Sequence, residues 1–189
     1  MKILGLDSSG IVASVAIVED ENLIAEYTVN YKKTHSQTLL PMLDELVKMT
    51  ELDLDTIDAI AVAAGPGSFT GLRIGSATAK GLGLALKKPL VEIPTVDALA
   101  YNLYDSRALI CPIMDARRSQ VYTGIYRFQE HKLVTVEAQM AVPMAEMIEK
   151  LNARGEEVVF LGDGVPVFGK MIQENLKVPY SFAPAHVNK

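Results

Sequence analysis

The spacing of apolar residues in the first half of the chain changes from a strand pattern to a helix pattern near residue 34. Before that point, segments rich in β-forming residues predict strands over 2–7, 13–20 and 21–30. Over 34–50, apolar residues recur at steps of three and four, which predicts a helix. Strands over 58–65 and 89–94 and helices over 68–86 and 95–104 are predicted to follow in alternation.

The second half of the chain repeats this layout. Its predicted strands cover 108–115, 120–128, 131–137 and 156–164, and its predicted helices cover 143–155 and 165–176. A three-stranded meander followed by alternating helices and parallel strands is the layout of ribonuclease H-like domains, which the actin, sugar kinase and Hsp70 superfamily duplicates. We therefore predict an α/β protein with duplicated ribonuclease H-like (actin-like) domains, residues 1–105 and 106–189.

Composition and charge narrow the function classes. The chain has 189 residues, of which 49% are hydrophobic and 22% charged, as is typical of a soluble globular protein. The chain has a net charge of −5, and its dense basic residues form only isolated pairs, Lys32-Lys33, Lys87-Lys88 and Arg117-Arg118. Strong direct binding of nucleic acid is therefore not expected. A minor contribution to such binding within a complex stays open. The single cysteine favours the cytoplasm, and no apolar run reaches the roughly 20 residues of a membrane helix.

The first predicted strand ends in Asp7-Ser8-Ser9, which has two interpretations. In the actin-like superfamily, an acid and hydroxyls at this place lie beside nucleotide phosphates, with a second acid from the other half, here Asp115. Alternatively, the carboxylate caps a turn by accepting hydrogen bonds from nearby backbone N–H groups. The residues alone favour the turn.

The sequence GPGSFTGLRIG, residues 65–75, joins a predicted strand to a predicted helix. A glycine-rich turn before a helix presents backbone N–H groups to an anion, so Gly65, Gly67, Ser68 and Thr70 are candidate anion or nucleotide contacts. Ser68 and Thr70 are also good helix caps. The loop is not a P-loop, because it lacks the Lys followed by Ser or Thr. Alternatively, its glycines only form a tight turn.

The predicted helix over 68–86 carries small residues at every fourth position, namely Gly71, Gly75, Ala79 and Gly83. Glycine within a helix costs roughly 1 kcal/mol relative to alanine, so close approach of another backbone is predicted. Packing within the chain's own core would explain one such ridge. We expect a partner helix instead, because the neighbouring helix is also rich in apolar residues. The expected interface residues are Leu39, Leu43, Leu46, Gly71, Gly75 and Ala79.

Other catalytic candidates are weak. The three histidines, His35, His131 and His186, have no metal-binding spacing. Cys111 lies in a predicted buried strand, which predicts an inert thiol. There is no Gly-x-Ser-x-Gly motif and no plausible Cys/His couple, and nothing in the sequence resembles a complete catalytic set.

The motifs together resemble the bacterial TsaB family, also called YeaZ. The resemblance rests on AAGPGSFTGLRIG, on DSS near the start, on HSQTLLPMLDEL and on MDARRSQVY, in order along the whole chain. It implies the duplicated actin-like fold and a role in making threonylcarbamoyladenosine, a modification of the tRNA adenosine beside the anticodon. In that machinery the catalytic subunit is a paralogue, TsaD, and an ATPase, TsaE, joins the complex. The resemblance implies a non-catalytic dimerisation subunit.

One departure from the catalytic paralogue supports this implication. After an Ile-Pro pair, that paralogue carries two metal-binding histidines four residues apart, whereas this chain has Asp97 and Tyr101 at those positions. A carboxylate and a phenol do not replace two imidazoles for iron or zinc, so neither a metal site nor catalytic residues are expected.

The resemblance also sets the expected partners. They are TsaD and TsaE, a homodimer in isolation, and tRNA only indirectly through the complex; no membrane is expected. No cofactor is firmly expected beyond ATP or ADP at a subunit junction. Family members usually extend further, so either this homologue is short or its C-terminal domain is truncated. The alternative function is an ATPase or small-molecule kinase of the actin-like superfamily that uses Asp7, Asp115 and the 65–75 loop.

Overall fold

The computed structural model describes residues 1–31 and 35–188. The basic pair Lys32-Lys33 and the start of the predicted first helix at Thr34 lie outside the described residues. The chain divides into two compact units, Met1–Thr95 and Val96–Lys189.

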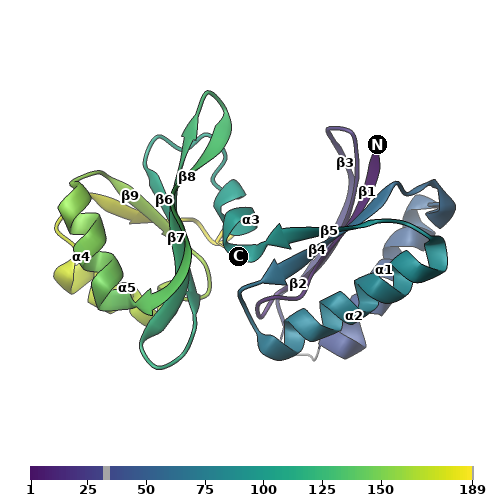
Figure 1. The fold of residues 1–189 in the computed structure, drawn as a ribbon, viewed down its shortest axis with the longest axis horizontal. Helices are drawn as coiled ribbons and strands as arrows, with labels where there is room; N and C mark the ends of the chain where they lie inside the picture. The colour runs from purple at the N-terminus through teal and green to yellow at the C-terminus, as the bar shows by residue number, and fades with distance from the viewer. Residues whose placement is uncertain (32–34, 189) are drawn as a thin grey trace. The chain divides into compact units, whose positions relative to one another are not determined.

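The first unit is a five-stranded sheet in the order β3-β2-β1-β4-β5 (Figure 1). Strands β1 to β3 form an antiparallel meander, and β4 pairs in parallel with both β1 and β5. Helices α1 and α2 cover one face of this sheet. The elements are β1 (Lys2–Asp7), β2 (Ala13–Glu19), β3 (Asn22–Val29), α1 (His35–Thr50), a 3-10 turn η1 (Leu54–Thr56), β4 (Ala59–Gly65), α2 (Phe69–Leu86) and β5 (Leu90–Pro94).

The second unit repeats the arrangement, with a five-stranded sheet in the order β10-β9-β6-β7-β8. Strands β6 to β8 form the meander, and β9 pairs in parallel with β6 and β10. Helices α4 and α5 pack on one face and α3 on the other. The elements are α3 (Thr95–Tyr101), β6 (Leu109–Asp115), β7 (Gln120–Gln129), β8 (Lys132–Pro143), α4 (Met144–Arg154), β9 (Val158–Leu161), α5 (Val165–Asn175) and β10 (Tyr180–Phe182).

The matching strand order in the two units confirms the predicted duplicated ribonuclease H-like fold. Strand β10 escaped prediction because its three residues are too short to show a periodicity. The division between the units follows Thr95, the first residue of α3, whereas the boundary expected near Asp105 follows the whole helix. The physical reason is that Val96 and Ala100 of α3 are buried against the second sheet.

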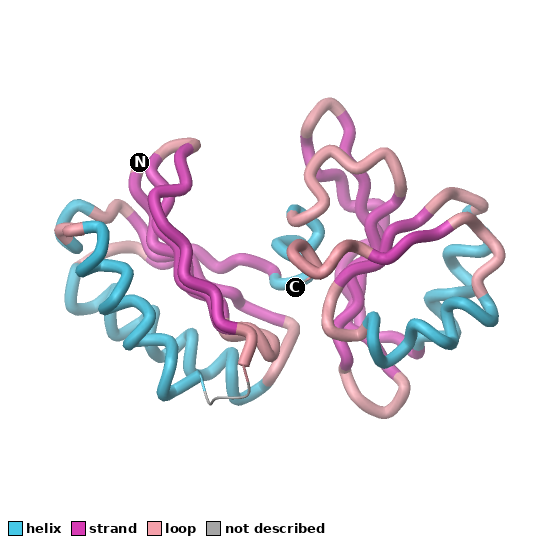
Figure 2. The backbone as a smooth tube through the Cα atoms, turned by 180° about the vertical axis from the view of Figure 1, so that it is seen from behind, coloured by secondary structure: helices cyan, strands magenta, loops and turns pink. Residues whose placement is uncertain are grey.

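Burial follows the periodicity of the elements. In β1 and β2, alternate residues such as Leu4, Leu6 and Val15 face the helices and are buried. On α4, the buried residues Met144, Met147, Ile148 and Leu151 have helical spacing. Figure 2 shows the resulting layers of helices against strands in each unit. In the described residues, no helix is long and apolar enough to span a membrane.

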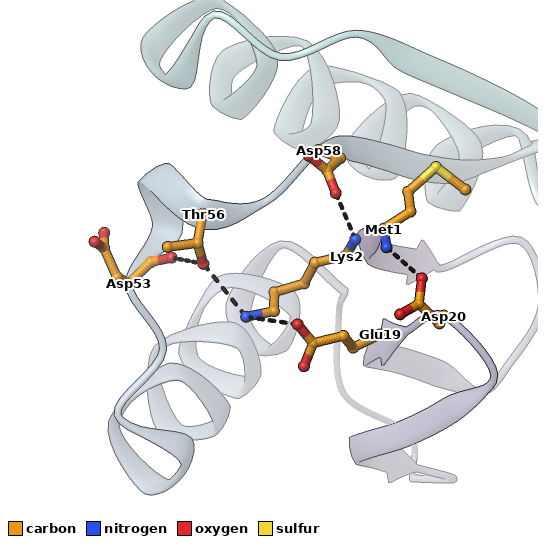
Figure 3. A network of polar contacts seen from close by, with 7 residues as sticks. All are labelled: Met1, Lys2, Glu19, Asp20, Asp53, Thr56 and Asp58. Atoms are coloured by element: carbon orange, nitrogen blue, oxygen red, sulfur yellow. Dashed lines mark hydrogen bonds and ion pairs between the residues drawn. The ribbon is translucent and has the colours of Figure 1, made fainter.

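Polar contacts fix the amino-terminal end of the first sheet (Figure 3). The Lys2 backbone N–H donates to Asp58 Oδ2 at 2.6 Å, which ties β1 to the segment before β4. Lys2 Nζ lies 3.5 Å from both Thr56 Oγ1 and Glu19 Oε1. The loops that carry the DSS and GPGSFTG motifs follow the opposite, carboxyl ends of β1 and β4.

Candidate functional site

The carboxyl ends of β1 and β4 lie side by side, because these strands pair in parallel up to Leu6 and Val62. The turn after β1 is held by Asp7, whose Oδ1 accepts a hydrogen bond from the Ser9 N–H at 2.7 Å. This is the capped turn that was the alternative to phosphate chemistry. Asp7 therefore has a structural role in the local backbone.

The turn after β1 is bonded directly to the start of α2. Ser8 Oγ donates to the Gly71 carbonyl at 2.9 Å, and the Ser68 N–H donates to the Ser9 carbonyl at 2.6 Å. Ser8 and Ser9 are buried. The DSS and GPGSFTG motifs, far apart in sequence, thus form one hydrogen-bonded assembly, which we call the DSS–GPG junction (residues 7–10 and 65–71).

Glycine is required at this junction because the backbones are in contact. A Cβ atom on Gly67 would lie 2.3 Å from the Ser9 carbonyl oxygen, and one on Gly71 would lie 1.9 Å from the Ser8 carbonyl oxygen. A Cβ on Gly75 would lie 2.6 Å from Ser8 Oγ. The close approach predicted from the ridge of small residues exists, but it is made by the chain's own turn.

The six residues expected at a partner interface lie inside the first unit. Gly71, Gly75 and Ala79 are buried on the inner side of α2. Leu39, Leu43 and Leu46 are buried in the core of the first unit, where they pack with residues of β1, β2 and β4. A side chain that fills its own core does not present a surface to a partner, so these six residues support folding.

Much of the glycine-rich loop's hydrogen-bonding capacity is used internally. The Gly65 N–H donates to Thr95 Oγ1 at 3.2 Å. The Gly71 N–H donates to Ser68 Oγ at 3.3 Å, which confirms Ser68 as the cap of α2. Thr70 is exposed in the first turn. Anion or nucleotide contact by Asp7, Ser8, Gly65, Gly67, Ser68 and Thr70 stays a prediction.

The side chains at the positions of the paralogue's histidine pair make other contacts. Asp97 accepts a hydrogen bond from the Tyr126 hydroxyl at 2.6 Å. Burial, reinforced by this bond, raises the pKa of Tyr126 well above its ordinary value, so the phenol remains a donor. The ring of Tyr101 packs edge-on against Phe128, with ring centroids 5.8 Å apart. Within residues 1–31 and 35–188, no three His, Cys, Asp or Glu side chains are grouped so that they could hold a metal ion.

The second unit has the same turn at the equivalent place. Asp115 ends β6, and its Oδ1 accepts the Arg117 N–H at 2.8 Å. Its Oδ2 lies 3.3 Å from Arg117 Nη1, and its own N–H donates to Asp163 at 3.1 Å. Each half thus ends its first strand in an acid that caps the following turn.

Large apolar side chains are exposed on α1 and α2, and none of them is among the residues expected at the interface. They are Leu40 (52% exposed), Met49 (78%), Phe69 (68%) and Leu84 (84%). The Arg73 guanidinium lies 3.8 Å from the centroid of the Phe69 ring. A groove beside α2 is lined by Phe69, Arg73, Ala77 and Lys80, with Glu92 of β5 opposite. The helical spacing of Phe69, Arg73, Ala77, Lys80 and Leu84 could have identified this face, but α2 is apolar or small on nearly every side.

Comparisons with known proteins agree with this fold. The model of the family described as "TsaD: tRNA N6-adenosine threonylcarbamoyltransferase" matches residues 22–188. A curated relative from Bacillus subtilis, named tRNA threonylcarbamoyladenosine biosynthesis protein TsaB, is 36% identical over 93% of this chain and 77% of that protein. The protein of the same name from Escherichia coli is 30% identical over 87% of this chain and 72% of that protein.

Solved structures give the same result. YeaZ from Pseudomonas aeruginosa superposes with a TM-score of 0.82 at 27% identity, covering 98% of this chain and 84% of that one. The ethanolamine utilization protein EutJ from Carboxydothermus hydrogenoformans, at a TM-score of 0.53 and 14% identity, shares the fold alone and covers 100% of this chain and 87% of that one. The motifs, the duplicated fold and these relatives together show that the chain belongs to the TsaB (YeaZ) family of tRNA threonylcarbamoyladenosine biosynthesis proteins.

Proposed function

We propose that this chain is a non-catalytic subunit of the tRNA threonylcarbamoyladenosine-modifying complex, in which it binds and supports the catalytic paralogue TsaD together with the ATPase TsaE. The complex acts in the cytoplasm, and tRNA is held chiefly by the other subunits. In isolation the same surface pairs two copies of this chain. We also propose that ATP or ADP binds at a subunit junction as an accessory ligand.

The observation that carries the proposal is the exposed apolar face of α1 and α2. Leu84 and Phe69 belong to the outward side of α2, opposite the ridge that packs on the turn after β1. On the adjacent helix α1, Leu40 and Met49 are also exposed, and, being nine residues apart, they lie on opposite flanks of that helix. Large apolar side chains exposed together on two neighbouring helices are typical of a protein-binding surface. The partner surface is thus assigned to the outer faces, in place of the six buried residues.

A second observation supports the absence of catalysis. Asp97 is engaged by the buried hydroxyl of Tyr126, and Tyr101 packs on Phe128. Both side chains at the positions of the histidine pair therefore stabilise the second unit. The rival function, an ATPase or kinase, gains no support from the 65–75 loop, whose N–H groups at Gly65, Ser68 and Gly71 bind within the protein.

Substitution of Leu84 by lysine tests the interface. Because Leu84 is 84% exposed, Leu84→Lys leaves the core intact but places a charge in the apolar contact, and we expect loss of co-purification with TsaD. Val167→Lys on α5, where the side chain is 57% exposed, is the matched control and should keep full binding. Equal recovery of TsaD with wild type and Leu84→Lys would contradict the proposed surface.

A further inference from the structure

The turn between β6 and β7 has an unusual backbone. Arg117, Arg118 and Ser119 all have left-handed conformations, with φ of 66°, 52° and 60°. Non-glycine residues rarely adopt this backbone conformation, and it persists only when surrounding contacts enforce it. Among the residues that the structure describes, no other three consecutive non-glycine residues share it.

Several contacts hold this turn, which we call the Arg turn (residues 115–119). Asp115 accepts the Arg117 N–H at 2.8 Å, and the Arg117 carbonyl accepts the Gln120 N–H at 3.0 Å. The Ser119 carbonyl accepts the N–H of Met144, the first residue of α4, at 3.1 Å. The backbone is therefore fixed from β6, β7 and α4, and a rigid turn presents two adjacent arginines.

Both guanidinium groups are accessible. The Arg117 side chain is 86% exposed although it lies 3.3 Å from Asp115. Arg118 is exposed, and its side chain has no ion pair or hydrogen bond to any other described residue. Asp115, only 19% exposed, pairs with Arg117, and Arg118 adds a second positive charge to the Arg turn; the Asp163 carboxylate, which accepts the Asp115 N–H, is a further charged group beside the turn.

This arrangement fits an anion with several acceptor oxygens. Guanidinium is planar and donates paired hydrogen bonds, which match the geometry of phosphate. A rigid backbone lowers the entropy lost on binding. Because the net charge of the chain is −5, a polyanion is attracted only at a local basic site such as this one. The family's role in tRNA modification supplies a polyphosphate ligand.

We propose that the Arg turn contacts the phosphate backbone of RNA, so that this chain contributes directly, by one or two phosphates, to holding tRNA in the complex. The inference deepens the proposed function and rests on it for the presence of the other subunits. The other basic pair on a described surface, Lys87-Lys88, differs because Lys88 Nζ donates to the Asp55 carbonyl at 2.8 Å.

The test is a titration of fluorescent tRNA with the complex assembled from wild-type or variant chain, TsaD and TsaE. Each phosphate contact steepens the fall of log affinity with log salt by about 0.7 for a single strand and about 0.9 for a DNA duplex. We expect the double substitution Arg117→Gln and Arg118→Gln to make this salt dependence shallower, by about 1 to 2 in the magnitude of the slope. The affinity for tRNA should fall by roughly threefold to tenfold near 0.1 M salt. Lys87→Gln with Lys88→Gln removes the same charge and should change neither.

Site-specific crosslinking identifies the ligand. Because Cys111 is fully buried and burial raises the pKa of its thiol to about 12, a cysteine introduced by Arg118→Cys is the reactive thiol for a photocrosslinker. A crosslink to tRNA from position 118, with none from Lys87→Cys, is the expected result. A crosslink to protein alone, or an unchanged salt slope in the double variant, overturns the inference.

The outcome is separable from that of the proposed function. If the wild-type chain does not assemble with TsaD, the proposed function fails. The crosslink from position 118 is then read on the isolated chain mixed with tRNA at low salt, where its absence still overturns the role of the Arg turn.

Discussion

At the residue scale, glycine in α2 has two different roles. Gly71 lies against the Ser8 carbonyl oxygen, where an added Cβ would be only 1.9 Å away. Gly81, in the same helix, has no atom within 4 Å of an added Cβ. Gly71 lies in the first turn of α2 and Gly81 in its interior, but helix propensity favours alanine over glycine in a helix, so a loss of stability at Gly71 would come from the tertiary contact.

This difference can be measured by alanine substitution. We expect Gly81→Ala to stabilise the protein by about 0.5–1 kcal/mol, because alanine is the better helix former. Gly71→Ala should destabilise it by about 1–3 kcal/mol, since the turn after β1 must move to admit the methyl group. Urea unfolding of the two variants gives both values. Stabilisation by Gly71→Ala would show that the contact with Ser8 is absent.

At the element scale, α3 depends on one buried polar contact and a small apolar cluster. Val96 and Ala100 pack on the second sheet, and the Tyr126 hydroxyl from β7 donates to Asp97 of α3. Gly124 accommodates this tyrosine, because a Cβ there would lie 2.6 Å from the Tyr126 hydroxyl oxygen. The bond therefore anchors a helix of only seven residues.

Removing this hydroxyl should weaken the second unit. Tyr126→Phe loses a hydrogen bond to a carboxylate, which stabilises a fold by about 1.5–3 kcal/mol. Folding raises the pKa of Tyr126, so the neutral phenol stabilises the folded state fully at pH values below the unfolded-state pKa of about 10. This stabilisation is lost as the pH rises above that value. The free energy of unfolding should thus fall by about 1.4 kcal/mol per pH unit above pH 10.

The comparison needs a background without the thiol. Burial raises the pKa of Cys111 to about 12, so Cys111 also loses stabilising effect as pH rises above its ordinary value. In the Cys111→Ala background, denaturant titrations at pH 9 to 11 give the free energy of unfolding at each pH. This free energy should fall with pH when Tyr126 is present and should fall less steeply in Tyr126→Phe. Identical slopes would mean that the phenol is not held as described.

At the scale of the whole molecule, the fold is that of the actin-like superfamily, and the residues of the DSS–GPG junction hydrogen-bond to one another. Asp7 accepts the Ser9 N–H, and the Ser68 N–H donates to the Ser9 carbonyl. The loop geometry of that superfamily is therefore compatible with a purely structural junction. Whether the chain turns over ATP separates the subunit proposal from its rival.

We expect no multiple turnover when the purified chain is incubated with ATP and Mg²⁺. Phosphate release is measured for wild type and for Asp7→Asn, which keeps an acceptor for the Ser9 N–H but removes the charge. Turnover by wild type that Asp7→Asn abolishes would establish the ATPase or kinase in place of the non-catalytic subunit.

The sequence by itself determined the elements, their duplicated order and the family. Apolar periodicity is a local property, so it located α1, α2 and the strands up to β9, and motifs read in order identified the TsaB relatives. Only the tertiary structure decided which side of α2 is inside. Because α2 is small or apolar on most sides, its periodicity did not distinguish the Gly71 ridge from the Leu84 face. The close approach of Ser8 decided it: a side chain on Gly71 would meet that backbone, whereas Leu84 meets solvent.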